Sequence, residues 1–371
     1  MTEREAVIDA FLAENGWQGA KRNPLPGDAS FRRYQRLTLG GRNAMLMDAP
    51  PPVEDVDAFV AVARHLKSLG FSAPDIFAKD KANGFLIIED LGDETFTRLL
   101  ASSNNTAEAE LYQLGVDVLI ELHRIEATGV MPPGLKDYDD DKLLDEALLL
   151  VDWTWPAVFG GDAPGDVRNA YRNAWLSVFA QLRSQPPTLV LRDFHVDNLM
   201  ILDGRQGVAR CGLLDFQDAV SGPGAYDLMS LLEDARRDVG DALKKAMLER
   251  YLTAFPDIDR SAFEATFAIL AAQRHAKVIG IFTRLSRRDS KPAYLDHLPR
   301  VWRLLENALP HPVLAPVAAW FDEHPDGLVI AYHRVLSTEA GEPVYTQAYR
   351  GRTLGIWARE AALADLERFK R

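Results

Sequence analysis

A chain of 371 residues, 47% hydrophobic and 26% charged, has an ordinary globular composition and is too long for a single compact core. Its 54 acidic residues outnumber its 42 Lys and Arg residues, and the net charge of −12 argues against a broad binding surface for nucleic acid or an anionic membrane. The single cysteine, Cys211, excludes an intrachain disulfide and a zinc site made of several cysteines. The acidic, amphipathic start and the lack of a long apolar run predict a soluble, cytoplasmic protein.

Residues 1–91 predict a small domain built on a β-sheet. The first segment has apolar residues at helical spacing and ends near Gly16, so it predicts a helix. Two runs rich in β-forming residues flank Gly40 and Gly41, which predicts a hairpin. A second helix ends near Gly70, and a short apolar strand then leads into a glycine turn. In chain order these segments are MTEREAVIDAFLAENG, SFRRYQRLT with RNAMLMDA, VEDVDAFVAVARHLKSLG and GFLIIEDLGD.

From residue 92 onward the pattern is mostly helical, and we expect residues 92–310 to form a larger helical domain. The clearest helices are LYQLGVDVLIELHRI and SAFEATFAILAAQRHAKVIGIFTRL. Residues 311–371 predict a hairpin of LVIAYHRVL and EPVYTQAYR followed by a helix. Their Trp, Tyr and β-branched content favours a structural extension that contributes no catalytic group. The chain as a whole therefore predicts an α+β fold.

Two short stretches inside the helical half place acidic and amide side chains where core packing does not require them. LRDFHVDNLMIL carries Asp193 and Asn198, and CGLLDFQD carries Asp215 between two apolar residues. The metal that accompanies ATP needs hard oxygen ligands, which Asn198 and Asp215 supply. Phosphoryl transfer needs one further carboxylate to take a proton from the acceptor hydroxyl, and Asp193 fits that role. Each residue alone also fits a turn or a strand end, but their joint spacing after a β-rich domain favours a kinase active site.

These stretches resemble the catalytic loop and the metal-binding stretch of the aminoglycoside phosphotransferase-like kinases. The resemblance runs from about residue 20 to about residue 310 and includes LLDFQDAVSGPGAYDLMSLL. It implies a bilobal fold, with residues 1–91 as an ATP-binding lobe and residues 92–310 as a helical lobe that holds the catalytic loop and a sugar site. Within this superfamily, GDASFRRYQR and AAQRHAKVIGIFTRLSRRD are similar to the bacterial anomeric kinases of N-acetylmuramate and N-acetylglucosamine, which serve cell-wall recycling.

The resemblance implies ATP and Mg²⁺ as cofactors, with Asp193 as the base and Asn198 and Asp215 as magnesium ligands. It also implies an adenine-binding hinge near Glu89 and Leu91 and a phosphate-covering loop along GDASFRR, a stretch that fits an ordinary hairpin turn equally well. The residues expected to contact the nucleotide are Gly27, Ser30, Arg32, Arg33, Glu89 and Leu91.

The strand MLMDAP departs from the family pattern, because two methionines stand where related kinases place the lysine that contacts the α- and β-phosphates. The phosphate cation must therefore come from elsewhere. Arg32 and Arg33 alternate on the preceding strand, so we expect one to face the cleft and the other to lie on the surface. Glu54 or Asp57 fits the place of the carboxylate that pairs with that lysine, and a charge at a helix N-terminus is the simpler interpretation of both.

Five residues are candidates for sugar binding: Glu146, Trp153, Arg236, Arg274 and His275. Trp153 suits stacking on a sugar ring and Glu146 suits hydrogen bonds to hydroxyl groups, with core packing and surface solvation as the respective alternatives. The two arginines suit the carboxylate of N-acetylmuramate. Ion pairing with Asp234 or Asp238 explains Arg236 equally well.

The expected partner is a small-molecule sugar, and two other functions stay open. One is a kinase of another small hydroxyl compound, such as an aminoglycoside or a choline-like amine. The other is a regulatory pseudokinase that binds a nucleotide without transferring its phosphate. The missing lysine is compatible with this interpretation. His123 is expected to be a core residue, whereas His195 and Asp227 are expected to support the catalytic loop.

Overall fold

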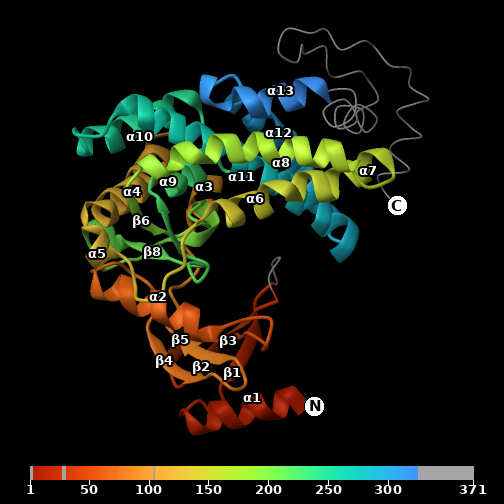
Figure 1. Cartoon of the computed structure of the whole chain (residues 1–371). Coiled ribbons are helices and arrows are strands. Elements are labelled where there is room, and N and C mark those ends of the chain that lie inside the picture. Colours follow the sequence, from red (N-terminus) through yellow and green to blue (C-terminus); the bar gives the residue numbers. More distant parts are fainter. Residues whose placement is uncertain (1–2, 27–30, 103–104, 325–371) are drawn as a thin grey trace. The chain divides into compact units, whose positions relative to one another are not determined.

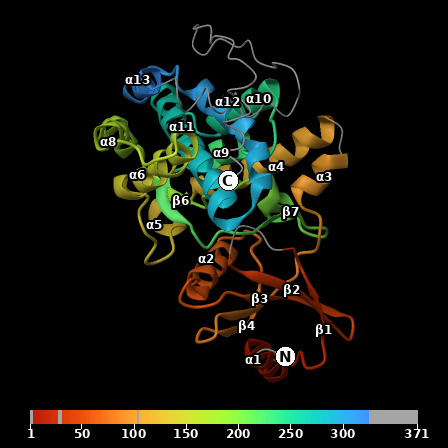
Figure 2. The same cartoon turned by 90° about the vertical axis from the view of Figure 1, so that its right-hand side faces the viewer.

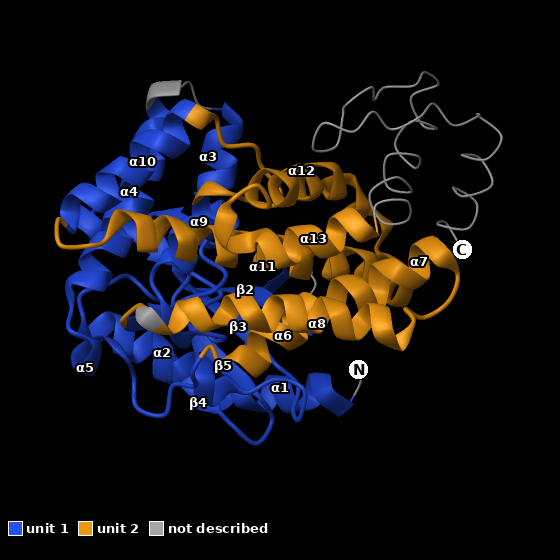
Figure 3. Ribbon diagram, turned by 45° about the horizontal axis from the view of Figure 1, so that its top comes forward, with its two compact units in different colours: residues 1–137, 187–231, 242–255 blue, residues 138–186, 232–241, 256–371 orange. Residues whose placement is uncertain are grey.

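The computed structural model describes residues 3–26, 31–102 and 105–324, and the chain divides into two compact units (Figure 3). Unit 1 comprises residues 1–137, 187–231 and 242–255, and unit 2 comprises residues 138–186, 232–241 and 256–371. The chain therefore passes between the units several times, whereas the lobes expected from the sequence are consecutive segments. The domain boundaries after residues 91 and 310 stay a prediction.

A five-stranded antiparallel sheet with the order β1-β2-β3-β5-β4 forms the first part of unit 1 (Figure 1). The predicted hairpin is confirmed, because β2 pairs with β3 along its whole length. Gly40 and Gly41 turn the chain with φ of 57° and 78°, a region that glycine adopts without steric cost. The strands are β1 (Lys21–Pro24), β2 (Arg33–Leu39), β3 (Arg42–Asp48), β4 (Ile76–Asp80) and β5 (Phe85–Ile88).

Two helices lie on opposite faces of this sheet (Figures 1 and 2). Helix α1 (Glu3–Glu14) buries Ile8, Phe11 and Leu12 in one core with the sheet residues Leu37, Leu46 and Ile87. Because successive side chains of a strand point to opposite faces, the residues between these project to the other side, where Tyr34, Arg36, Met45 and Ile88 line a cavity together with Phe59 of helix α2 (Val56–Ser68). One face of the sheet thus packs against α1, and the other face lines the cavity.

From residue 187 the chain is again part of unit 1, where it forms two small two-stranded antiparallel sheets. Strand β6 (Pro187–Val190) pairs with β9 (Val220–Pro223), and β7 (Leu199–Ile201) pairs with β8 (Cys211–Leu213). Isolated bridges from Ser72 to Gly212 and from Thr95 to Met200 join the β7–β8 hairpin to segments that flank the sheet strands. The other elements of this unit are α3 (Phe96–Ser102), α4 (Asn105–Arg124), α5 (Ala127–Val130), most of α9 (Ala225–Leu232) and α10 (Asp241–Ala254), and the 3₁₀ turns Val196–Asn198 and Gly207–Arg210.

Unit 2 is helical and is organised around α11 (Arg260–Asp289), a helix of 30 residues (Figure 3). This helix packs against α6 (Asp140–Leu149), the π-helical turn Leu150–Thr154 and α12 (Leu298–Ala308). Gly280 allows the closest approach, because a Cβ atom there would lie 2.2 Å from the backbone carbonyl carbon of Leu149. The other elements are α7 (Trp155–Phe159), α8 (Gly165–Phe179), α13 (Ala315–Glu323) and the 3₁₀ turns Ala180–Ser184, Pro292–His297 and Pro312–Leu314.

The predicted C-terminal extension is described as far as α13. Trp320 and Phe321 of this helix pack against Tyr171 of α8, with ring centroids 4.5 and 6.2 Å from that of Tyr171. The hairpin and the final helix predicted for the end of the chain lie outside the described residues. In the described part of the chain, no helix combines the length and the apolar character needed to cross a membrane.

Candidate active site

The loop between β6 and β7 carries Asp193, and a buried carboxylate fixes its start. Asp227, at the first turn of α9, is fully buried and accepts hydrogen bonds from the backbone N–H groups of Leu191 (2.6 Å) and Arg192 (2.9 Å). Arg192 has a φ of 68°, a left-handed conformation that costs free energy for a residue with a side chain. Asp227 therefore stabilises the strained turn that presents Asp193, which is the anchoring role expected from the sequence.

The other end of the loop brings Asn198 next to Asp215. The backbone N–H of Leu214 donates to the carbonyl oxygen of Asn198 (3.0 Å). This bond extends the pairing of β7 with β8 by one residue, so Asn198 lies next to the segment that leads into Asp215. The side-chain amide nitrogen of Asn198 donates to the carbonyl oxygen of Asp193 (3.0 Å). Asp215 itself has a φ of 57°. Two short β-strands thus place the three predicted chemical groups in one small region of unit 1.

Burial and two neighbouring charged groups determine the electrostatic surroundings of Asp215. Desolvation by the surrounding protein raises the pKa of Asp215 although 37% of its side-chain surface stays accessible, the Arg32 guanidinium opposes this rise, and the Asp193 carboxylate adds to it. A cation bound here would stabilise both carboxylates in their charged form.

The oxygen atoms of Asn198 and Asp215 suit a Mg²⁺ ion that is bound together with a nucleotide. No group of three or more His, Cys, Asp or Glu side chains suited to holding a metal occurs among the described residues. Mg²⁺ in phosphoryl-transfer sites is, however, commonly held by one or two protein groups together with phosphate oxygens and water. Asp215 and Asn198 offer oxygen atoms of the right kind, and they fit a metal that is bound together with a nucleotide.

A cavity of about 340 Å³ lies beside these residues, within unit 1. Its lining includes the segment from Ile88 to Asp93, as well as Asn198 and Asp215. The hinge region predicted near Glu89 and Leu91 therefore lines the same cavity as the predicted metal ligands. The apolar part of the lining suits a flat aromatic ring and includes Met45, Phe59, Ile88, Leu91, Met200 and Leu214.

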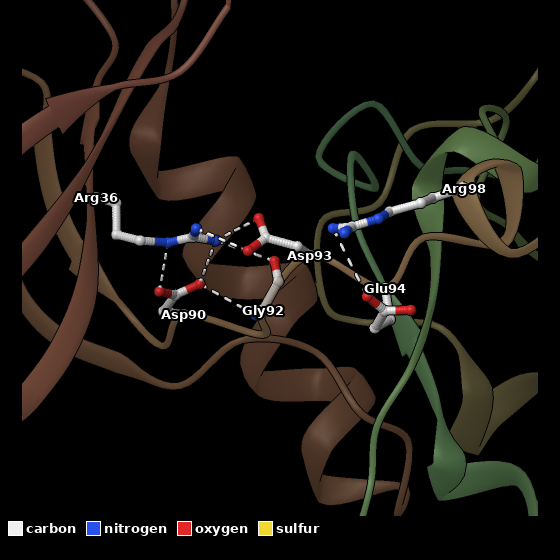
Figure 4. A network of polar contacts seen from close by, with 6 residues as sticks. All are labelled: Arg36, Asp90, Gly92, Asp93, Glu94 and Arg98. Carbon is white, nitrogen blue, oxygen red and sulfur yellow. Dashed lines mark hydrogen bonds and ion pairs between the residues drawn. The ribbon is translucent and has the colours of Figure 1, made fainter.

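Arg36 of β2 ties the sheet to this hinge segment, as Figure 4 shows. Its guanidinium contacts the carboxylate of Asp90 (2.7 Å), the carboxylate of Asp93 (2.8 Å) and the carbonyl oxygen of Gly92 (3.1 Å). Asp90 in turn accepts a hydrogen bond from the backbone N–H of Gly92 (3.0 Å). Arg36 was not predicted from the sequence, although Arg32, Tyr34 and Arg36 follow one another at intervals of two residues, which places all three on one face of the sheet.

The two arginines at the start of β2 have different surroundings. Arg32 lines the cavity, its side chain is 8% exposed, and it forms ion pairs with Asp215 (3.0 Å) and Glu54 (3.5 Å). Arg33 is exposed. Gly27 and Ser30, which the resemblance placed over the phosphates, lie outside the described residues. Contact with a nucleotide stays a prediction for Gly27, Ser30, Arg32, Arg33, Glu89 and Leu91.

Three of the residues predicted to bind sugar lie in a buried polar cluster of unit 2. Glu146 is 5% exposed, so surface solvation does not explain it. Its carboxylate accepts hydrogen bonds from the hydroxyl of Tyr138 and the side-chain amide of Gln273 (3.3 Å), and it pairs with the ammonium of Lys277 (3.2 Å). On the same helix, α11, the fully buried His275 contacts the carboxylate of Glu233 at 2.7 Å.

Arg274 stands between these pairs on α11 and differs from its neighbours. The residue is 4% exposed. Among residues 3–26, 31–102 and 105–324 its guanidinium makes no hydrogen bond or ion pair, and its Nη1 atom is buried. A buried arginine without a counter-charge is costly, so this position suits an anionic ligand.

The remaining two candidates lie less deeply. Trp153 is half-buried on the π-helical turn, whereas the nearby Trp155 is a core residue that packs on Phe159 and Trp320. The backbone N–H of Arg236 donates to Asp234 (2.8 Å). Asp238, the other acid proposed as its partner, pairs with Arg300 and Arg303. Sugar binding by Glu146, Trp153, Arg236, Arg274 and His275 stays a prediction.

The chain is similar to several known proteins. Residues 21–263 match the family model described as the phosphotransferase enzyme family. The N-acetylmuramate/N-acetylglucosamine kinase of Caulobacter vibrioides is 37% identical, with 87% of this chain and 97% of that protein covered. The protein of the same name from Pseudomonas aeruginosa is 36% identical, with coverage of 86% and 94%. An ADP-bound aminoglycoside phosphotransferase has the same fold, with a TM-score of 0.55, 15% identity and coverage of 82% and 98%.

Proposed function

We propose that this chain, which belongs to the phosphotransferase enzyme family, transfers the γ-phosphoryl group of ATP to the C1 hydroxyl of N-acetylmuramate or N-acetylglucosamine. One arrangement supports this most directly: Asp193, Asn198 and Asp215 lie together beside a cavity that the hinge segment also lines. The relatives named for both sugars match nearly their whole length to this chain. Both sugars are building blocks of peptidoglycan, so we place the enzyme in cell-wall recycling in the cytoplasm.

ATP would enter the cavity of unit 1 with its adenine against the apolar lining and the hinge backbone. A volume of about 340 Å³ is in the range of sites for small ligands. Arg36 and its bonds to Asp90, Gly92 and Asp93 would hold the hinge backbone in place for the base. Asn198 and Asp215 would hold Mg²⁺, which when bound neutralises charge on the phosphates and on the transferred group.

Asp193 would act as the base for the acceptor. The C1 hydroxyl oxygen of the sugar attacks the γ-phosphorus, the bond from the γ-phosphorus to the bridging oxygen breaks, and the proton of the C1 hydroxyl group passes to the Asp193 carboxylate, giving the sugar 1-phosphate and ADP. The C1 hydroxyl of a free sugar belongs to a hemiacetal and is more acidic than an ordinary alcohol, so a carboxylate base of ordinary strength suffices. Asp227 and Asn198 hold the loop on both sides of this carboxylate and limit its movement.

Unit 2 would recognise the sugar. The cluster around Glu146 offers acceptors and donors for hydroxyl and acetamido groups. Arg274 would bind the carboxylate that N-acetylmuramate carries and N-acetylglucosamine lacks. Trp153 would stack on a face of the sugar ring, with Arg236 and His275 supporting this arrangement.

The composition of this cluster also bears on the alternative substrates. An aminoglycoside or a choline-like amine is a cation, and its site requires an excess of carboxylates. Glu146 and Glu233 are already paired with Lys277 and His275, and Arg274 adds a positive charge. The cluster therefore suits a neutral or anionic sugar better than a cationic amine.

The test is a phosphorylation assay. Purified protein is incubated with ATP, Mg²⁺ and N-acetylmuramate, N-acetylglucosamine, glucose, choline or kanamycin, and ADP release is followed. We expect turnover with the two N-acetyl sugars and none with the methyl glycoside of N-acetylglucosamine, in which C1 is blocked. Phosphorylation of that glycoside would place the reaction on another hydroxyl, and turnover with an amine alone would overturn the proposal. ATP binding without turnover of any acceptor would favour a pseudokinase.

A further inference from the structure

Two methionines occupy the part of β3 that faces the cavity. Met45 and Met47 alternate with Leu46, which lies in the opposite core with α1. Neither methionine can bind a phosphate. Among the described residues that line the cavity, the cationic side chains are Arg32 and Arg36. Arg36 is engaged with the hinge carboxylates Asp90 and Asp93, so Arg32 is the cation placed nearest to the predicted metal ligands.

The pairing of β2 with β3 explains how Arg32 reaches this place. Tyr34 lies opposite Met47, and Arg32 precedes it by two residues, so the side chains of Arg32, Tyr34 and Met47 project to the same face. The Arg32 guanidinium then contacts Asp215 at 3.0 Å and Glu54 at 3.5 Å, and the Tyr34 hydroxyl is within its hydrogen-bonding reach. Arg32, which directly precedes β2, thus projects from the same face of the sheet as Met47 of β3.

The structure also separates the two acidic residues that the sequence left open. Asp57 pairs with Lys79 and Lys81, and its side chain is 34% exposed. Glu54 is 19% exposed and pairs with Arg32. The carboxylate that can orient a cation of the cavity is therefore Glu54, which precedes α2, whereas Asp57 belongs to a surface group.

We propose that Arg32 binds the α- and β-phosphates of the nucleotide and that Glu54 is its positioning residue, a cation–carboxylate pair moved from β3 to the start of β2. This inference rests on the proposed use of ATP but not on the identity of the sugar. A guanidinium presents several N–H donors in one plane, so it can bind a phosphate oxygen while it keeps its contact with Glu54. The ion pair of Arg32 with Asp215 offsets part of the cost of burying that carboxylate.

The test measures nucleotide binding without any sugar. Binding of MgATP, MgADP and adenosine is measured by calorimetry for the wild type and for Arg32→Met, with Arg64→Met as the control because Arg64 is an exposed arginine of α2 outside the cavity lining. Loss of a charge-assisted contact predicts MgATP and MgADP binding weaker by about 10- to 100-fold in Arg32→Met, with adenosine binding unchanged. Arg64→Met is expected to bind all three like the wild type.

Glu54→Gln gives a second, independent readout. This variant is expected to weaken MgATP binding about three- to tenfold by leaving Arg32 less well oriented, and to add nothing in the Arg32→Met background, because the two residues act as one unit. In Arg32→Met, Met47→Lys is expected to restore part of the MgATP affinity, since it returns a cation to β3. Unchanged MgATP binding in Arg32→Met, or an equal loss of MgATP and adenosine binding, would overturn the inference. Neither result depends on which sugar the enzyme phosphorylates.

Discussion

The polar groups of unit 1 and unit 2 are arranged in different ways. In unit 1, Arg32, Asn198 and Asp215 border a cavity and lie on a loop, a hairpin and a strand end. In unit 2, Glu146 and its partners Gln273 and Lys277 lie on two packed helices and bond mainly to one another. Groups that border a cavity are available to a large ligand, whereas groups that satisfy one another chiefly fix the geometry of the helices that carry them.

The backbone differs in the same sense. Arg192 and Asp215 adopt left-handed conformations in unit 1, and the buried carboxylate of Asp227 accepts hydrogen bonds from the turn that contains Arg192. Unit 2 instead relies on α11, which carries Gln273, Arg274, His275 and Lys277 within a little more than one helical turn. Strain that is stabilised by a buried group is common where chemistry occurs. The strained backbone and the cavity therefore support the proposal that phosphoryl transfer takes place in unit 1, whereas sugar binding by the helices of unit 2 stays a prediction.

The largest effect is expected from Asp193→Asn. Loss of the base should lower kcat by about 10²- to 10⁴-fold, whereas MgADP affinity should stay near that of the wild type because Asp193 acts on the acceptor. Asp215→Asn is the matched variant, and it should weaken Mg²⁺-dependent nucleotide binding as well as turnover. Calorimetry with and without Mg²⁺, combined with initial rates, separates the two. Near-normal rates in both variants would break the assignment of chemistry to unit 1.

Gly280→Ala tests whether unit 2 depends on close helix packing. The added methyl group would lie 2.2 Å from the backbone of Leu149, so α11 and α6 must move apart, at a cost of about 3 kcal/mol or more in the free energy of unfolding. Gly165→Ala is the control, since this helical glycine has nothing within 4 Å of the added atom. Thermal unfolding should show a clear loss of stability for the first variant and none for the second. Equal melting temperatures would contradict tight packing at this contact.

Arg274→Met separates the two sugars. The variant should raise KM for N-acetylmuramate by about 10- to 100-fold, because a charge-assisted bond to the carboxylate is lost. N-acetylglucosamine has no such carboxylate and serves as the internal control, with an expected KM within about twofold of the wild type. Steady-state kinetics with both sugars on one protein preparation decides this. A parallel loss with both sugars would indicate a purely structural arginine.

The smallest effect concerns a polar pair in the core of unit 1. Burial lowers the pKa of His123 to about 4 from its ordinary value of 6.5, and its Nδ1 contacts the hydroxyl of Tyr251 at 2.8 Å. Between these two pH values the unfolded chain binds a proton that the folded chain does not, so stability falls as the pH is lowered from 6.5 toward 4. His123→Asn, which cannot take up that proton, should lose less stability over this range. Melting curves at pH 7 and pH 5 compare the slopes, and identical slopes would contradict the shifted pKa.

Local patterns predicted the parts of the fold that local physics determines. The helix at the start, the hairpin around Gly40 and Gly41, and the helix before Gly70 are all found where glycine and apolar spacing place them. Asn198 and Asp215 could be predicted as neighbours because their motif spacing is characteristic. The sequence could not distinguish Glu54 from Asp57 or predict the contacts of Arg36, since these follow from strand register and from contacts such as Arg36 to Asp93, 57 residues apart.

The burial of polar side chains in unit 2 could not be predicted from the sequence either. Glu146 has the composition of a surface helix around it, and its partners Gln273 and Lys277 lie more than a hundred residues further along the chain. A single sequence contains no signal that links positions so far apart. The contact of Gly280 with Leu149 could not be predicted for the same reason. A glycine inside a helical pattern indicates that another segment packs closely against the helix, but it does not identify that segment.

The bond from the Ser72 hydroxyl to the carbonyl oxygen of Ala209 spans 137 residues of chain, and it has a consequence for how the protein is made. During synthesis, the sheet of residues 21–88 leaves the ribosome long before the β7–β8 hairpin that bridges to Ser72 and Thr95. Contacts between distant segments form slowly, because a long loop must close before they are gained. The cavity is lined by residues 25–95 and by residues 198–215, so its lining is complete only after residues 138–186 of the other unit have been made.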